Sequence, residues 1–168
     1  MNSVSKNSKL GRQAARPEEK ILLALKKSRK TLALAESCTG GLVAHRMTNV
    51  PGASASFKGG IVSYSDGAKT DLLNVPPDVI GEHGAVSRQT ARAMAEGARR
   101  VLKADMAAAI TGIAGPGGGS ARKPVGLAYI AFSSEDGDRT KKIVLDGNRI
   151  SLKLKFAQAV IDFIRENV

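Results

Sequence analysis

Tryptophan is absent from this sequence and aromatic residues make up only 4% of it, so its core has to be aliphatic. The single cysteine, Cys38, excludes an internal disulfide and a cysteine-rich metal site. No apolar run approaches the roughly 20 residues that cross a bilayer, and the N-terminus lacks the apolar segment of a secretory signal. A membrane partner is therefore not expected, and the default expectation is a cytoplasmic protein.

Acidic residues are also scarce, since 15 Asp and Glu stand against 26 Lys and Arg, a net charge of +11. Nine of those basic residues lie within residues 1–30, beside only two acids, Glu18 and Glu19. Residues 1–16 show no apolar periodicity, which predicts a flexible basic N-terminal tail. Such a tail is either simply solvated or touches nucleic acid or acidic lipid. The remaining residues are only mildly basic, which suits a small anionic ligand as well as DNA, so nucleic acid is not the favoured partner.

What the sequence does contain is an alternation of strand-like and helix-like segments along 168 residues, enough for one domain over residues 17–168. Helices are expected at residues 17–30, 42–48, 66–73, 88–102 and 149–166. Strands are expected at residues 31–36, 60–65, 106–110, 126–132 and 141–145, the last two joined by an acidic turn at 135–138. Strands separated by helices predict a sheet covered on both faces, and the hairpin-like final pair adds an antiparallel member. The fold class predicted is α/β, a three-layer α/β/α sandwich with a mixed, mostly parallel sheet.

Three loops follow predicted strands: residues 37–41, 64–69 and the glycine-rich 111–119. Ligands of open α/β sheets bind at the carboxyl ends of the strands, so these loops are expected to share one site. The glycine-rich loop lacks the Gly-Lys-Ser/Thr ending of a P-loop, although its backbone N–H groups could still face a phosphate.

Ser37 stands where a strand is expected to meet a helix, shortly before Gly40 and Gly41. This arrangement points backbone N–H groups at an anion or a developing oxyanion. The alternative is that Ser37 or Thr39 only caps the helix. Cys38 is either a second candidate nucleophile or a buried structural thiol; the latter is favoured because neither histidine of the chain shows an obvious pairing with it.

Lys69 follows Tyr64-Ser65-Asp66 by one helical turn. It is either an exposed helix lysine or a base, and the second role requires surroundings that lower its pKa from ~10.4 toward ~7. No cluster of His, Cys and Asp has metal-ligand spacing, so neither a metal nor another cofactor is expected.

Six ordered motifs make the sequence resemble a known family. They are Ala35–Gly41 (AESCTGG), Ser63–Ser65 (SYS), Ala68-Lys69, Glu82–Ser87 (EHGAVS), Thr111–Pro116 (TGIAGP) and Lys123–Gly126 (KPVG). Together they resemble the CinA C-terminal domain family, that of the competence/damage-inducible protein and of nicotinamide-nucleotide amidohydrolases. The resemblance covers roughly Pro17 to Val168 and implies the same three-layer fold.

The resemblance also implies residue roles. It makes Ser37 the nucleophile and Lys69 its base, with Tyr64 and Thr111 beside them in the catalytic site. The substrate contacts that it implies are Thr39, Gly40, Gly41, Gly112, Gly115 and Arg149. Some relatives have Ser in place of Thr111, which keeps the hydroxyl, and relatives tend to carry Gly-Asp-Arg where this chain has Gly147-Asn148-Arg149.

The implied reaction is hydrolysis of nicotinamide mononucleotide to nicotinate mononucleotide and ammonia by a Ser–Lys mechanism, a step of pyridine nucleotide salvage. The implied partners are this small nucleotide substrate and further copies of the chain in a homo-oligomer. The rival hypothesis is a non-enzymatic module that senses a nucleotide or takes part in a competence or DNA-damage interaction.

Overall fold

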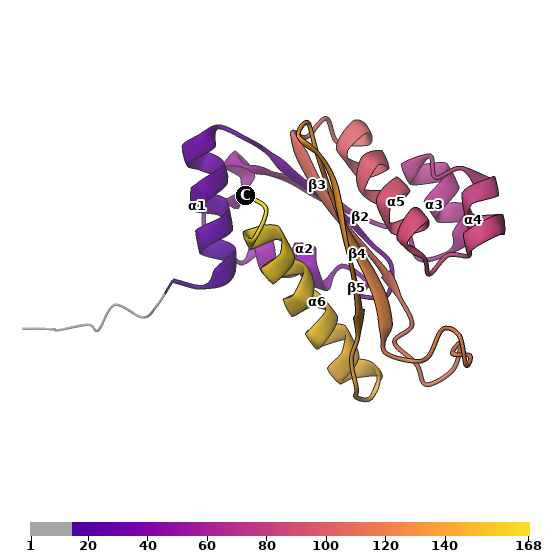
Figure 1. Cartoon of the computed structure of the whole chain (residues 1–168). Coiled ribbons are helices and arrows are strands. Elements are labelled where there is room, and N and C mark those ends of the chain that lie inside the picture. Colours follow the sequence, from indigo (N-terminus) through magenta and orange to yellow (C-terminus); the bar gives the residue numbers. More distant parts are fainter. Residues whose placement is uncertain (1–14) are drawn as a thin grey trace, which may run out of the picture.

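A five-stranded mixed sheet divides the protein into two helical layers in the computed structural model, which describes residues 15–168 (Figure 1). The strands are β1 (Leu32–Glu36), β2 (Phe57–Val62), β3 (Met106–Gly112), β4 (Leu127–Ser134) and β5 (Gly137–Val144). They lie in the order β2-β1-β3-β4-β5. Strand β1 pairs in parallel with β2 and β3, whereas β4 pairs antiparallel with β3 and β5. Four of the five strands therefore point the same way, which confirms the predicted fold class.

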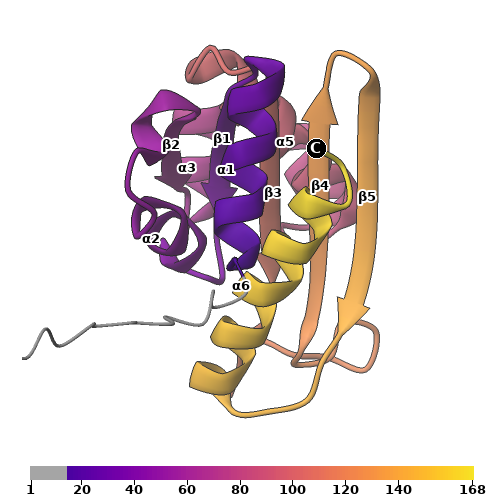
Figure 2. The same ribbon diagram turned by 90° about the vertical axis from the view of Figure 1, so that its left-hand side faces the viewer.

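The helices are divided between the two faces of the sheet (Figures 1 and 2). One face is covered by α1 (Pro17–Ser28), α2 (Leu42–Thr48) and α6 (Arg149–Arg165). The other face carries α3 (Asp66–Leu73), α4 (Pro77–His83) and α5 (Arg88–Val101), and a single 3₁₀ turn (Ala53–Ala55) precedes β2. Local signals start several of these helices. The hydroxyl of Ser65 accepts the Ala68 N–H at 3.1 Å, and the hydroxyl of Ser87 accepts the Thr90 N–H at 3.1 Å.

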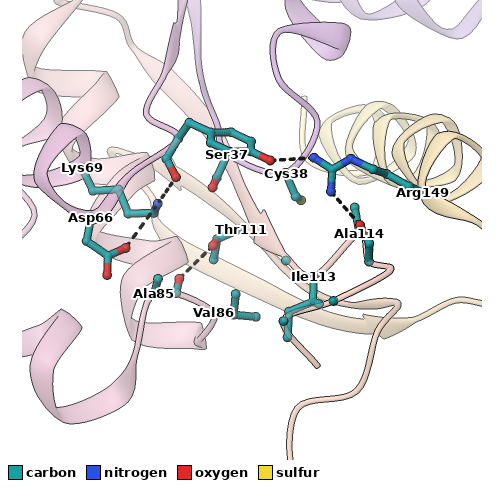
Figure 3. Close-up of a pocket in the computed structure, with 15 residues that line it drawn as sticks. Ser37, Cys38, Asp66, Lys69, Ala85, Val86, Thr111, Ile113, Ala114 and Arg149 are labelled. Carbon is teal, nitrogen blue, oxygen red and sulfur yellow. Dashed lines mark hydrogen bonds and ion pairs between the residues drawn. The ribbon is translucent and has the colours of Figure 1, made fainter. Parts of the chain in front are cut away.

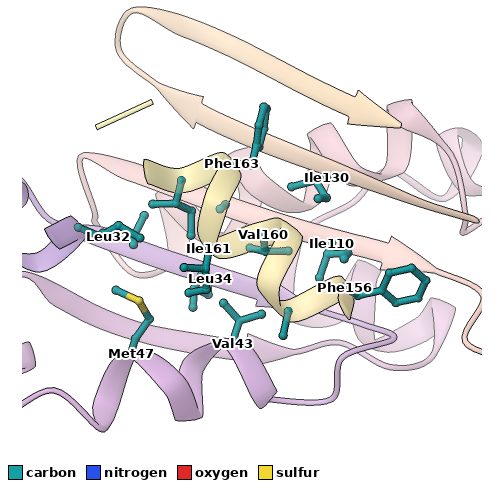
Figure 4. Packing of buried hydrophobic residues seen from close by; sticks show 14 of the residues in the cluster. Leu32, Leu34, Val43, Met47, Ile110, Ile130, Phe156, Val160, Ile161 and Phe163 are labelled. Carbon is teal, nitrogen blue, oxygen red and sulfur yellow. The ribbon is translucent and has the colours of Figure 1, made fainter. Parts of the chain in front are cut away.

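The core consists of two apolar clusters, one on each face of the sheet, because successive side chains of a strand point to opposite faces. In β1, Leu32 and Leu34 belong to the cluster under α1, α2 and α6, whereas Ala33 and Ala35 belong to the cluster under α3 and α5. The first cluster contains the larger side chains, among them those that α6 buries against β1, β3 and β4 (Figure 4). The second is mostly alanine, which allows α5 to lie close to the sheet.

Three elements differ from the sequence prediction. Strand β2 begins at Phe57 rather than at residue 60 and ends at Val62. The pair Gly59-Gly60 does not predict a strand, because glycine has low strand propensity. A Cβ on Gly60 would lie 2.9 Å from the Cβ of Ala44 on α2, so the close packing of that helix requires glycine. Strand β5 also begins earlier, at Gly137, because an edge strand tolerates the charged residues that were predicted to form the turn.

Helix α4 was not predicted, since Pro76-Pro77 was interpreted only as the end of α3. Pro77 occupies the first position of α4, where its missing N–H is not needed. The loop between α4 and α5, residues 84–87, is thereby brought to the carboxyl end of β3, where the Thr111 hydroxyl donates to the Ala85 carbonyl at 2.8 Å.

Most of the predicted basic tail, residues 1–14, lies outside the described residues. Arg16, which the prediction assigned to that tail, is the N-cap residue of α1, and its N–H and Nε both donate to the carboxylate of Glu19. Within residues 15–168, no helix has the length and apolar character needed to span a membrane.

Candidate active site

A cavity of about 250 Å³ opens at the carboxyl ends of β1 and β3, where the three loops were predicted to meet (Figure 3). Its wall includes Ser37, Tyr64, Lys69, Thr111 and Arg149, five residues that are far apart in the sequence. It also includes Gly112 and Gly115, but not Thr39, Gly40 or Gly41. The prediction that these loops share one site is consistent with this arrangement.

Ser37 directly follows β1, and its N–H donates to the carbonyl of Ile110 on β3 at 3.1 Å. This bond continues the parallel pairing of β1 with β3 and thereby fixes the position of Ser37 at the floor of the cavity. The residue is 7% exposed, and no other described residue hydrogen-bonds its hydroxyl. The hydroxyl is therefore available to a molecule in the cavity.

The turn after Ser37 is held by a residue that sequence reasoning missed, Glu36. This side chain is 1% exposed, and its two carboxylate oxygens accept the N–H groups of Gly41, Val43 and Ala44 at 3.0, 3.1 and 2.8 Å. Glu36 thus occupies the N-terminus of α2 and satisfies N–H groups that would otherwise have no partner.

This arrangement corrects two predictions. Neither Ser37 nor Thr39 caps α2, because the Glu36 carboxylate does so. The N–H groups of Gly40 and Gly41 are not available to an oxyanion in the cavity, since the first donates to the Ser37 carbonyl at 3.1 Å and the second to Glu36.

Lys69 lies on α3 and is 1% exposed, so it is not the exposed helix lysine of the alternative interpretation. Its Nζ donates to the carbonyls of Ser63, Tyr64 and Ser65 at 3.1, 3.4 and 3.4 Å and lies 3.8 Å from the Asp66 carboxylate. Burial lowers the pKa of Lys69 below the ordinary lysine value, against the opposing effects of Asp66 and Cys38.

The side chains of Lys69, Ser37 and Thr111 converge on the same part of the cavity (Figure 3). No direct hydrogen bond joins Lys69 Nζ to Ser37 Oγ, although both residues are described. An amine whose pKa is lowered, in the same cavity as an unbonded hydroxyl, supplies the two groups that a nucleophile and its base require.

Cys38 lines the same cavity but belongs to the apolar core. It is 5% exposed, and burial raises the pKa of its thiol to about 12. A thiol with that pKa is protonated near neutral pH and is a poor nucleophile, which supports the structural interpretation of Cys38.

Arg149 joins three elements at the mouth of the cavity. From the first turn of α6, its guanidinium donates to the Gly115 carbonyl and to the Tyr64 hydroxyl, both at 2.7 Å (Figure 3). Gly115 has φ +73°, and a Cβ there would lie 2.7 Å from a methyl of Val125, so the glycine-rich loop needs glycine at this position.

A family model described as the CinA C-terminal domain matches residues 14–168. The chain belongs to the CinA C-terminal domain family. It is 50% identical over 138 residues to a CinA-like protein of Geotalea uraniireducens, covering 82% of this chain and 33% of that relative. A CinA-like protein of Acidobacterium capsulatum is 45% identical over 151 residues, covering 90% of this chain and 36% of that relative. The chain thus spans about a third of the length of these curated relatives.

Solved structures of the CinA family share the fold. The competence/damage inducible protein CihA from Agrobacterium tumefaciens matches with a TM-score of 0.85 and 39% identity, covering 88% of this chain and 91% of that one. A CinA superfamily protein from Escherichia coli matches with a TM-score of 0.84 and 27% identity, covering 92% and 94% of the two chains.

One departure of this chain from the motifs expected of CinA domains is explained by the structure. Asn148 is the N-cap residue of α6, and its side-chain oxygen accepts the Ser151 N–H at 3.0 Å. Asn and Asp cap helices about equally well, so Asn in place of Asp preserves the start of the helix that carries Arg149.

Ala85 and Val86 are among the wall residues of this CinA domain that had no predicted role. They lie in the motif Glu82–Ser87, which carried part of the resemblance but to which no role in the site was assigned. Within residues 15–168, no group of three or more His, Cys, Asp or Glu side chains is placed to hold a metal ion.

Proposed function

We propose that this CinA domain is an amidohydrolase that converts nicotinamide mononucleotide and water to nicotinate mononucleotide and ammonia. The observation that carries the proposal is the placement of a buried lysine with a lowered pKa, Lys69, in one cavity with the unbonded hydroxyl of Ser37. A cytoplasmic role in pyridine nucleotide salvage and assembly into a homo-oligomer belong to the same proposal.

In the first half of the reaction, neutral Lys69 Nζ accepts the Ser37 Oγ proton while Oγ attacks the carboxamide carbon. The carbonyls of Ser63, Tyr64 and Ser65 hold the amine in the cavity wall and accept hydrogen bonds from the ammonium when it forms. The Lys69 ammonium then protonates the departing nitrogen, which leaves as ammonia. An ester between Ser37 and the nicotinoyl group remains.

In the second half, Lys69 takes a proton from water, which attacks the ester carbon. The bond from that carbon to Ser37 Oγ then breaks, nicotinate mononucleotide leaves, and Lys69 returns its proton to Oγ. Because the Gly40 and Gly41 N–H groups are occupied, the oxyanion needs other donors. Ala114, Gly115, Gly117 and Gly118 line the cavity, and their N–H groups donate to no described residue. We assign stabilisation of the oxyanion to this loop.

The test is to incubate the purified chain with nicotinamide mononucleotide in the presence of EDTA and to measure ammonia and nicotinate mononucleotide together. Equal amounts of both products are expected, and none from Ser37→Ala. If the wild-type chain releases neither ammonia nor nicotinate mononucleotide, the proposal is wrong.

One observation favours a second candidate function, nucleotide binding without hydrolysis. Lys69 Nζ contacts three carbonyl oxygens and a carboxylate but not Ser37, an environment that also suits a permanently charged ammonium acting as a sensor of anions. Calorimetric binding of nicotinamide mononucleotide with no release of ammonia would support this sensor function.

A further inference from the structure

A second cavity, of about 540 Å³, lies on the other side of the loop at residues 84–87. We name it the basic groove and define it by His83, Arg88, Lys123, Tyr129 and Lys142. Its remaining wall residues are Glu82, Val86, Ser87 and Gln89. Val86 lines both the groove and the cavity of Ser37, so the two are neighbours across a single residue.

The charges that face the groove favour an anion. Three cationic side chains line it, Arg88, Lys123 and Lys142, against one carboxylate, Glu82, whose side chain is 76% exposed and lies 3.8 Å from the ring of His83. The groove also lies at the N-terminal end of α5, where the helix dipole is positive. An excess of positive charge in a concave surface attracts a phosphate group.

Several polar groups of the groove lack a hydrogen-bond or ion-pair partner among the described residues. Lys142 makes no hydrogen bond or ion pair with any described residue, and the Tyr129 hydroxyl makes no hydrogen bond with any of them. Among the described residues, Arg88 donates only to the Thr140 hydroxyl, at 3.0 Å. Lys123 donates to the His83 carbonyl at 2.7 Å, which ties the segment after the glycine-rich loop to the end of α4 beside the groove.

The two cations that line the Ser37 cavity, Lys69 and Arg149, make more hydrogen bonds to described residues than the cations of the groove do. Lys69 is buried among three carbonyls and is assigned to proton transfer. The guanidinium of Arg149 already donates to Gly115 and to Tyr64. Beyond Val86, a nucleotide with its carboxamide at Ser37 meets further positive charges, those of Arg88, Lys123 and Lys142 in the groove.

We propose that the basic groove binds the phosphate group of the substrate and makes the enzyme select a phosphorylated nucleotide over the corresponding nucleoside. This inference rests on the proposed function, because it places the carboxamide at Ser37. It assigns a specificity role to Arg88 and Lys142, which belong to none of the predicted sets of site residues.

The test variants are Lys142→Gln, Arg88→Gln and the two combined. The matched control is Lys141→Gln, which removes the same charge from the neighbouring residue of β5. Lys141 lies 3.7 Å from the Glu166 carboxylate and 5.8 Å from the ring centroid of Phe163, both on the side of α6. It therefore points away from the groove, as successive residues of a strand do.

Binding is measured by calorimetry at physiological ionic strength in the Ser37→Ala background, with nicotinamide mononucleotide and nicotinamide riboside as the two probes. Each single groove variant is expected to raise the Kd of the mononucleotide about three- to fivefold, and the double variant about tenfold or more. The Kd of the riboside and the effect of Lys141→Gln are expected to stay within about twofold. In the active background, the same groove variants raise KM with little change in kcat.

Equal Kd values for the mononucleotide with and without the groove cations would overturn the inference and would place the phosphate at Arg149 or the glycine-rich loop. An equal loss for riboside and mononucleotide would also overturn it. If the groove variants are neutral but ammonia is still released by the wild-type chain, the proposed function stands without the groove. If the groove variants weaken only mononucleotide binding and the wild-type chain releases no ammonia, the groove stands and the hydrolytic function fails.

Discussion

Glu36→Gln is expected to destabilise the turn that carries Ser37. The two carboxylate oxygens of Glu36 accept three backbone N–H groups, from Gly41, Val43 and Ala44. A glutamine has one oxygen, which can keep the bonds to Gly41 and Val43. In the wild-type chain, the Ala44 N–H lies 2.8 Å from Glu36 Oε1. In the variant, the glutamine NH₂ group replaces that oxygen, so two hydrogen-bond donors face each other in a buried place.

The size of the effect follows from these contacts. A hydrogen bond to a charged group contributes about 1.5–3 kcal/mol, and leaving a buried donor unsatisfied adds to this loss, so the variant is expected to lose about 3 kcal/mol of unfolding free energy. In a domain of this size each kcal/mol lowers Tm by about 2–4 °C, which gives a decrease of roughly 6–12 °C.

Thermal unfolding followed by circular dichroism measures this decrease, with Glu135→Gln as the control. The Glu135 side chain is 86% exposed, and among residues 15–168 it forms one ion pair, a 3.9 Å contact with Lys30. The control is expected to melt within about 1 °C of the wild-type chain. A Glu36→Gln chain that melts with the control would refute the reasoning, because the carboxylate would then not be what holds the start of α2.

Three further predictions concern the site and the N-terminus. Ser37→Ala is expected to abolish ammonia release with nearly unchanged Tm, whereas Cys38→Ala keeps most of the activity; the reverse pattern would exchange their roles. Because burial lowers the pKa of Lys69 and the neutral amine is the base, kcat/KM is expected to rise with pH through one ionisation below the ordinary lysine pKa of ~10.4 and then to level off. Lys69→Arg and Lys69→Ala are each expected to lose about 10²–10⁴-fold in kcat, and an active Lys69→Arg would make the residue a fixed charge instead of a base. Deleting residues 1–14 is expected to leave kcat/KM unchanged, and a fall in kcat/KM would assign these residues to the site. Any DNA affinity of the whole chain is expected to fall steeply with salt and to vanish with the deletion.

The elements that could be predicted are those with a local cause. Pro17 and two following acids mark the start of α1, and Ser65 and Ser87 act through their own hydroxyls on N–H groups three residues ahead. Because these signals need no distant partner, the helix starts were predicted to the residue. The start of strand β2 was misplaced because Gly59-Gly60 suits a strand only where a helix packs closely on it. Helix α4 was missed because Pro76-Pro77 can end one helix or begin the next, and only the surrounding structure distinguishes the two.

The location of the site could be predicted for a topological reason. Ser37, Tyr64 and Thr111 follow or end β1, β2 and β3, and parallel strands bring their carboxyl ends to one edge of the sheet. The roles of Ser37 and Lys69 came from the resemblance to the CinA family and remain predictions.

The fold class, the alternation of core side chains and the edge of the sheet at which polar residues gather could all be inferred from the sequence, because they follow from periodicity and chain order. Which polar groups are free became clear only from the folded chain. It placed Lys69 among three buried carbonyls, gave the N-terminus of α2 to Glu36 instead of to a ligand, and set Lys142 beside the loop of Val86. Burial and hydrogen-bond pairing depend on contacts between residues distant in sequence, which no local pattern of residues specifies.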